Sequence, residues 1–218
     1  MRFSLIIFDC DGVLVDSEPI TNRVFCRMLN ELGLEITFDE TMRTFMGRTM
    51  QGCVEIIEQR LGRPAPPDFI DDYYRRILPA FEGQLQPVTG VVDALDAITV
   101  PTCVASSGSH EKMRTTLGLT GLLSRFDGRL FSGTEVARGK PNPDLFLYAA
   151  REMGHAPDTC AVIEDSVAGV EAAVAAGMTV FGYAGYTPPD ALEGAGAIVF
   201  DDMRSLPELL ADDNASES

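Results

Sequence analysis

The sequence predicts an α/β fold, a doubly wound and mostly parallel sheet that an all-helical unit interrupts after the first strand. From residue 87 onward, short apolar strands alternate with amphipathic helices, which is the pattern of a parallel sheet with covered faces. Between residues 16 and 86, apolar residues recur only at helical spacing. We therefore expect an α/β core made of residues 1–15 and 87–218, and a helical domain made of residues 16–86.

The first strand is a short apolar run that begins at Phe3 and leads into two aspartates, Asp9 and Asp11. The run is too short to cross a bilayer, so we expect a buried strand that carries both carboxylates at its carboxyl end. A helix should follow from an N-cap at Ser17 to Gly33. Three further helices of the helical domain are expected at residues 38–46, 50–61 and 68–82.

The core should continue as strands that alternate with helices. The helices are expected at residues 88–98, 110–118, 140–153 and 166–177. The strands are expected at residues 102–107, 128–132, 159–165, 179–183 and 197–200. Residues 212–218 are polar and are expected to form a solvated tail.

The charge and the cysteines limit the partners and the compartment. The formal net charge is −16, from 33 acidic and 17 basic residues, so nucleic acid and anionic membranes are excluded as partners. The five cysteines show no paired spacing and no secretory signal precedes them, which predicts reduced thiols in a cytoplasmic protein. We expect a monomer or a homodimer. Only two basic residues are lysines, Lys112 and Lys140.

Polar side chains follow three of the predicted strands. They are Asp9 and Asp11 after the first strand, Ser106 on the second, and Glu164 and Asp165 on the fourth. In an open, doubly wound sheet these strand ends face one crevice. Crowded carboxylates repel one another unless a cation holds them, and an all-oxygen ligand set suits Mg²⁺ better than zinc.

A lysine and a hydroxyl beside a magnesium ion would form a phosphoryl-binding arrangement. Lys140 precedes the fourth strand, and positive charge there would neutralise a transferring phosphoryl group. Residues two apart on a strand share a face. One of Asp9 and Asp11 would therefore attack phosphorus while the other moves a proton.

Four segments together resemble the motifs of the haloacid dehalogenase superfamily, in the correct order. They are residues 9–18, 104–107, 139–143 and 162–169. The resemblance covers the whole chain and is greatest to the beta-phosphoglucomutase-like group of sugar phosphate phosphatases. It implies a Rossmann-like core with an inserted helical cap domain, and a small phosphate ester as the substrate.

The resemblance also implies a role for each motif residue of the core. Asp9 would be the nucleophile that becomes an aspartyl-phosphate, with one oxygen on Mg²⁺. Asp11 would act as general acid and then as general base, with its backbone carbonyl on the metal.

The other three motifs would bind the phosphate and the metal. Ser106 and the backbone amide of Ser107 would hold phosphate oxygens. Lys140 would pair with the nucleophile and the phosphate, while Asp165, helped by Glu164, would complete the magnesium site.

The cap is expected to determine substrate specificity. Arg48, Thr49 and Gln51 follow a glycine in an expected loop, so they are candidates for contacts with the distal part of the substrate. A solvated loop with no such contact is an equally simple interpretation.

The expected activity is Mg²⁺-dependent hydrolysis of a sugar phosphate or sugar acid phosphate such as 6-phosphogluconate. The main alternative is a sugar phosphomutase of the same group. Those enzymes have a histidine ten residues after the second aspartate and a cap arginine, where this chain has Thr21 and Met50. Both departures weaken the mutase interpretation.

Other classes fit less well. A phosphonoacetaldehyde hydrolase needs a cap lysine for its Schiff base, and residues 16–86 contain no lysine. A dehalogenase needs neither the acidic pair nor the second aspartate. A phospho-acceptor signalling domain would carry its acceptor on a middle strand and have no cap, and a non-catalytic binding protein would not need all four motifs.

Overall fold

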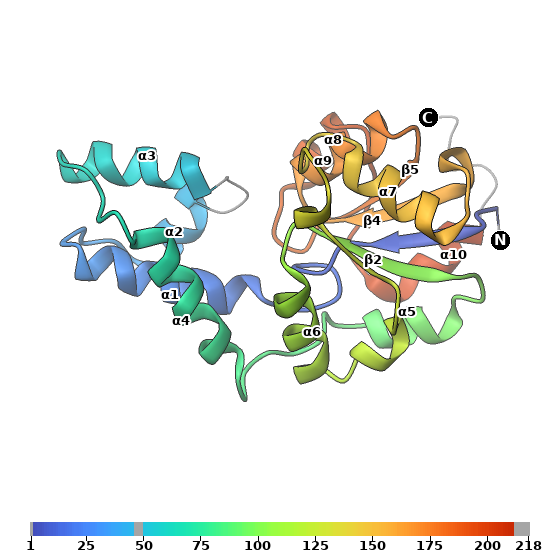
Figure 1. Cartoon of the computed structure of the whole chain (residues 1–218), viewed down its shortest axis with the longest axis horizontal. Helices are drawn as coiled ribbons and strands as arrows, with labels where there is room; N and C mark the ends of the chain where they lie inside the picture. The colour runs from blue at the N-terminus through green and yellow to red at the C-terminus, as the bar shows by residue number, and fades with distance from the viewer. Residues whose placement is uncertain (1, 46–49, 212–218) are drawn as a thin grey trace. The chain divides into compact units, whose positions relative to one another are not determined.

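The computed structural model describes residues 2–45 and 50–211 (Figure 1). The chain divides into two compact units, an α/β unit of residues 1–16 and 86–218 and a helical unit of residues 17–85. These boundaries lie one residue from those expected from the sequence. The expected tail at residues 212–218 lies outside the described residues. None of the helices within the described ranges combines the length and the apolar character that a membrane span requires.

The α/β unit contains a six-stranded parallel sheet in the order β3-β2-β1-β4-β5-β6. Every residue of the central strand β1 is buried, which explains its unbroken apolar sequence. Ile7 of β1 pairs with Cys103 on one side and with Val162 on the other. The strands are β1 (Leu5–Phe8), β2 (Thr102–Ser106), β3 (Leu130–Ser132), β4 (Cys160–Glu164), β5 (Thr179–Tyr183) and β6 (Ile198–Phe200).

Helices cover both faces of this sheet (Figure 1). Helices α7 and α8 lie on one face, where Phe146 and Val170 pack with Leu5 and Ile7 in one apolar core. The helices are α5 (Val91–Ala97), α6 (His110–Leu119), α7 (Asp144–Met153), α8 (Val167–Ala175), α9 (Pro189–Gly194) and α10 (Leu206–Ala211). Short 3-10 turns lie at Leu123–Phe126, Gly133–Glu135, Pro157–Thr159 and Met203–Ser205.

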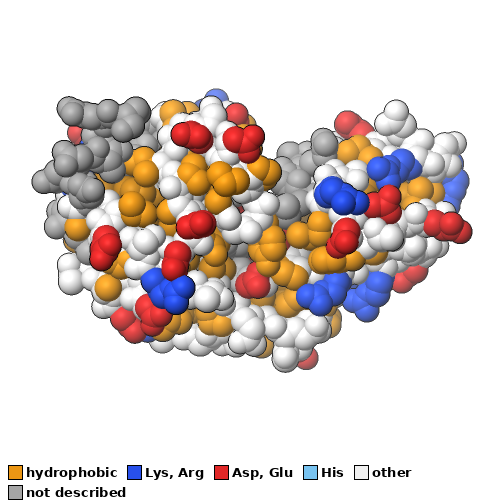
Figure 2. All heavy atoms as spheres, turned by 180° about the vertical axis from the view of Figure 1, so that it is seen from behind, with side chains coloured by type: hydrophobic (Ala, Val, Ile, Leu, Met, Phe, Trp, Pro, Cys, Tyr) orange, Lys and Arg blue, Asp and Glu red, His pale blue; other side chains and the backbone are white. Residues whose placement is uncertain are grey.

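The helical unit has an aromatic core. Phe25 makes edge-to-face contacts with Phe45, Phe69 and Tyr73, which join three of its helices. The helices are α1 (Glu18–Glu31), α2 (Phe38–Phe45), α3 (Met50–Leu61) and α4 (Phe69–Phe81). Figure 2 shows several basic side chains over this unit, whereas acidic side chains predominate over the visible face of the α/β unit.

The fold class is confirmed, but several element boundaries differ from those expected. Strand β1 ends at Phe8, before both aspartates, so the strand alternation argument does not apply to them. Helix α7 begins at Asp144 and not at Lys140, because Lys140 and Asn142 each precede a proline, which disfavours helical backbone. Ser17 occupies the N-cap position of α1 but makes no side-chain capping bond. Helices α9 and α10 were not anticipated.

Candidate active site

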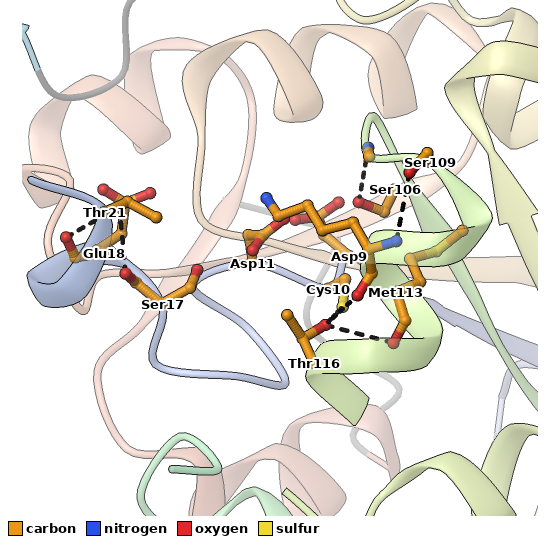
Figure 3. Close-up of polar contacts among 12 residues, drawn as sticks. Asp9, Cys10, Asp11, Ser17, Glu18, Thr21, Ser106, Ser109, Met113 and Thr116 are labelled. Atoms are coloured by element: carbon orange, nitrogen blue, oxygen red, sulfur yellow. Dashed lines mark hydrogen bonds and ion pairs between the residues drawn. The ribbon is translucent and has the colours of Figure 1, made fainter. Parts of the chain in front are cut away.

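Three adjacent strands bring the motif residues to one edge of the sheet. Strands β2 and β4 flank β1, and all three run in the same direction. Asp9 directly follows β1, Ser106 ends β2 and Glu164 ends β4. Their carboxyl ends therefore meet, as the sequence led us to expect. Figure 3 shows Asp9, Cys10 and Asp11 close to Ser106.

A tight loop after β1 takes the place of the expected strand extension. The Gly12 amide donates to the Val15 carbonyl at 2.9 Å, and the amides of Leu14 and Val15 both donate to the carbonyl of Cys10. Gly12 has a φ of +76°, which side chains rarely permit. A Cβ at Gly12 would lie 2.0 Å from Oδ2 of Asp165. The loop therefore packs its backbone directly against the carboxylate of Asp165.

Gly12 provides a test of this close approach. We expect Gly12→Ala to lower the phosphate-ester hydrolysis that the sequence predicts by at least about tenfold, because both the positive φ and the contact with Asp165 oppose a side chain. The matched control is Gly33→Ala, since Gly33 also has a positive φ, of +93°, but no atom lies within 4 Å of its Cβ position. Activity assays on both variants, together with measurement of their thermal unfolding temperatures, would check this prediction. Equal losses in the two variants would contradict a specific role for the approach to Asp165.

Lys140 joins two of the carboxylates. Its Nζ donates to Oδ1 of Asp9 at 2.6 Å and to Oε1 of Glu164 at 2.5 Å, and it also donates to the Ala105 carbonyl at 3.2 Å. The lysine side chain is only 6% exposed. Burial acts to lower the pKa of Lys140, but Asp9 and Glu164 more than compensate and raise it above its usual value. Lys140 is therefore a permanent positive charge inside the site.

Glu164 is fully enclosed by donors. Its Oε2 accepts hydrogen bonds from the backbone amides of Asp165 and Ser166 and from the hydroxyl of Ser166, each at 2.9 Å, while Oε1 accepts from Lys140. The residue is 1% exposed. These four hydrogen bonds offset the cost of burying the charge and fix Glu164 as the anchor of Lys140.

Asp9 lies in a site that disfavours its negative charge. Burial is the main reason why the pKa of Asp9 is raised to about 7; the neighbouring carboxylates of Glu164 and Asp11 also act to raise this pKa, while Lys140 acts to lower it without offsetting the effect of burial. A second cation beside Asp9 would remove this penalty. The electrostatics of the site thus favour a bound metal ion.

The carboxylates also have the spacing of a metal site. Asp9, Glu164 and Asp165 each offer an oxygen, and these oxygens all lie within 4.8 Å of one another. Carboxylate oxygens are the ligands of hard divalent cations. The residues present therefore fit a divalent metal.

Asp11 has a partner that the motifs do not include. Nζ of Lys112 lies 2.7 Å from Oδ2 of Asp11, and Lys112 lies in the first turn of α6. We assigned no role to Lys112 from the sequence, since it belongs to none of the four motifs. The available signal was that lysine occurs only twice in the chain.

The remaining candidates differ in how far the structure places them. Ser106 is buried and its Oγ accepts from the amide of Gly108 at 3.1 Å, whereas Ser107 is exposed at the start of the same loop. Gln51 is exposed at the start of α3 in the helical unit. Arg48 and Thr49 lie outside the described residues.

Two neighbouring segments lead from the α/β unit to the helical unit. The Asp16 amide donates to the carbonyl of Gln86 at 2.9 Å, and the Val88 amide donates to the carbonyl of Leu14 at 3.0 Å. The hydroxyl of Tyr186 donates to Asp16 at 2.8 Å. The chain therefore leaves the α/β unit five residues after Asp11 and returns to it in a segment that is hydrogen-bonded to the one by which it left.

Comparison with known proteins links this geometry to a family. Residues 3–177 match the family model for haloacid dehalogenase-like hydrolases. The chain is 32% identical, over 95% of both chains, to the 6-phosphogluconate phosphatase of Escherichia coli K12.

Solved structures share the fold along nearly the whole chain. A conserved haloacid dehalogenase-like protein of unknown function from Agrobacterium tumefaciens C58 is 37% identical, with a TM-score of 0.89 over 96% of this chain and 98% of its own. A hydrolase from Deinococcus radiodurans R1 is 33% identical, with a TM-score of 0.81 over 96% of each chain, and its crystal structure contains bound phosphate and sodium.

Proposed function

The chain belongs to the haloacid dehalogenase-like hydrolases and is a phosphatase, and we propose that its substrate is a sugar phosphate or a sugar acid phosphate. Hydrolysis would proceed through an aspartyl-phosphate on Asp9, with Mg²⁺ as the metal. The observation that carries the proposal is the buried contact of Lys140 with both Asp9 and Glu164. It holds a carboxylate nucleophile and a permanent positive charge 2.6 Å apart, which phosphoryl transfer requires.

In the first step, a carboxylate oxygen of Asp9 attacks phosphorus, and the bond from phosphorus to the sugar oxygen breaks. Lys140 and Ser106 bind phosphate oxygens and hold the group in line with Asp9. Asp11 gives its proton to the departing sugar oxygen, which leaves as a neutral alcohol.

In the second step, a water molecule attacks the phosphorus of the aspartyl-phosphate. Asp11, now a carboxylate, takes a proton from this water, so inorganic phosphate leaves and Asp9 is regenerated. One residue therefore serves both steps, and Asp11 ends the cycle as it began, protonated.

Asp9, Asp165 and the backbone carbonyl of Asp11 would hold Mg²⁺, with Glu164 beside them. When bound, the metal supplies positive charge that neutralises the phosphate oxygens and the carboxylate of Asp9. Glu164 already accepts four hydrogen bonds, so we assign it mainly to the positioning of Lys140.

The phosphatase proposal is preferred to a sugar phosphomutase because of Thr21. Its hydroxyl donates within α1 to the carbonyls of Ser17 and Glu18, both at 3.1 Å (Figure 3). It therefore offers no equivalent of the histidine that the mutases have at this position. Without the mutase histidine at position 21 and the mutase cap arginine at position 50, we expect water to be the acceptor of the phosphoryl group.

The test is release of inorganic phosphate from a panel of sugar phosphates that includes 6-phosphogluconate and β-glucose 1-phosphate. We expect hydrolysis with Mg²⁺ and a loss of at least about 100-fold with EDTA, because metal ions contribute several kcal/mol of charge stabilisation. Re-addition of Mg²⁺ should restore activity. Full activity in EDTA would rule out the metal, and conversion of β-glucose 1-phosphate to the 6-phosphate without phosphate release would show a mutase.

A further inference from the structure

The two lysines of the chain each contact one of the two aspartates that follow β1, Asp9 and Asp11. Lys140 lies 2.6 Å from Asp9, and Lys112 lies 2.7 Å from Asp11. The other fifteen basic residues, apart from the two histidines, are arginines. Lys112 and Asp11 are 101 residues apart in sequence and come from different segments of the α/β unit. Lys112 therefore has a specific place beside Asp11, although the proposed mechanism gives it no role.

The local structure is built to let Lys112 reach Asp11. Ser109 caps α6 and accepts from the amide of Lys112, so the lysine backbone is fixed in the first turn (Figure 3 shows Ser109 at this position). A Cβ at Gly108 would lie 3.3 Å from Cδ of Lys112. Gly108 thus leaves room for the lysine stem to cross toward Asp11.

Helix stability does not explain a lysine at this position. The N-terminal end of a helix carries partial positive charge, so a cation in the first turn of α6 is unfavourable there. The side chain of Lys112 is 22% exposed and that of Asp11 is 23% exposed, so the pair is largely shielded from water. A compact ammonium group also fits a single carboxylate oxygen, whereas a guanidinium prefers to contact both.

We infer that Lys112 is the positioning residue for proton transfer by Asp11, an inference that rests on the proposed function. When Asp11 gives its proton to the sugar oxygen, it becomes a carboxylate, and Lys112 stabilises and orients that carboxylate. The same contact holds Asp11 ready to take the proton from water in the second step. Lys112 itself neither gains nor loses a proton.

The experiment compares two leaving groups. We expect Lys112→Met to lower kcat/KM for 6-phosphogluconate, or for the best alkyl phosphate of the panel, by about 10- to 100-fold, below the full contribution of a general acid. For p-nitrophenyl phosphate, kcat/KM should change little, because p-nitrophenolate leaves without a proton. The ratio kcat/KM reports only the steps up to the breaking of the ester bond. Hydrolysis of the aspartyl-phosphate therefore does not affect it, and the comparison measures the acid role of Asp11 alone.

Three variants make the result decisive. Arg114→Met removes a positive charge from the exposed side of the same helix and should leave both values unchanged. Lys112→Arg keeps the charge and should recover part of the loss. Asp11→Asn should show the same difference between leaving groups as Lys112→Met.

Each outcome has one meaning. Suppose that Asp11→Asn lowers kcat/KM for the alkyl phosphate more than for p-nitrophenyl phosphate. The inference is then overturned if a folded Lys112→Met lowers kcat/KM equally for both substrates, or for neither. If Asp11→Asn itself shows no difference, the acid role of Asp11 in the proposed function is wrong. If Lys112→Met does not fold, the comparison is made on Lys112→Arg, where equal losses again overturn the inference.

Discussion

Replacement of Asp9 by asparagine should reduce phosphate release by about 10⁴-fold or more while the fold is retained, because it removes the nucleophile itself. In metal-free buffer at pH 8, the Asp9→Asn variant should be no less stable than the wild type. Burial raises the pKa of Asp9 to about 7, so the stability that the neutral carboxyl gives is lost as the pH rises through 7, and asparagine stays neutral. Phosphate-release assays and thermal unfolding would measure both effects.

The control for Asp9→Asn is Asp127→Asn, which makes the same chemical change in an exposed loop of the same unit. It should leave activity and stability unchanged. With a radiolabelled or mass-tagged substrate, the wild type should carry a transient phosphoryl group that Asp9→Asn lacks. Substantial turnover by a verified Asp9→Asn protein would refute the covalent mechanism.

Replacement of Lys140 by methionine should abolish activity and destabilise the protein by about 3 to 5 kcal/mol, the usual cost of removing one partner from a buried ion pair. The size of the effect follows from the 6% exposure of Lys140 and from its contacts with two carboxylates. Methionine keeps most of the apolar stem but removes the ammonium group, which also lies 4.8 Å from the centroid of the Phe146 ring, so the lost charge causes the effect. Denaturant unfolding would measure it.

A double variant separates the two roles of Lys140. Adding Glu164→Gln to Lys140→Met removes one of the stranded charges and should recover part of the lost free energy of unfolding, but none of the activity. Arg138→Met is the control: Arg138 lies two residues before Lys140, and the substitution breaks only an ion pair between the exposed Arg138 side chain and Asp144, so it should change little. If Lys140→Met were as stable as the wild type, or kept a tenth of its activity, the proposed role of Lys140 would be wrong.

The sequence was sufficient to predict the fold because periodicity reports burial. The continuous apolar run of β1, the strand-and-helix alternation after residue 87 and the helical spacing before it follow directly from which faces are covered. Parallel strands then bring Asp9, Ser106 and Glu164 together without further information, because their carboxyl ends share an edge.

Contacts between distant side chains could not be predicted in the same way. The motifs placed the carboxylate of Glu164 near the metal. Its four hydrogen bonds could not be predicted, because they depend on the conformation of the turn into α8. The contact of Lys112 with Asp11 depends on the cap at Ser109 and the space at Gly108, and neither changes the periodicity. Helix α7 begins four residues later than expected, because proline is favoured in the first turn of a helix but the residue before each proline is disfavoured from helical backbone.

The hydrogen bond between Asp16 and Gln86 has an evolutionary consequence. It joins the two ends of the insertion, so residues 17–85 enter and leave the α/β unit at a single point. Segments whose ends lie close together are tolerated as insertions, because they do not require the host fold to rearrange. A different helical module could therefore replace this one without moving Asp9 or Lys140, and the chain could acquire a new substrate while it keeps the same chemistry.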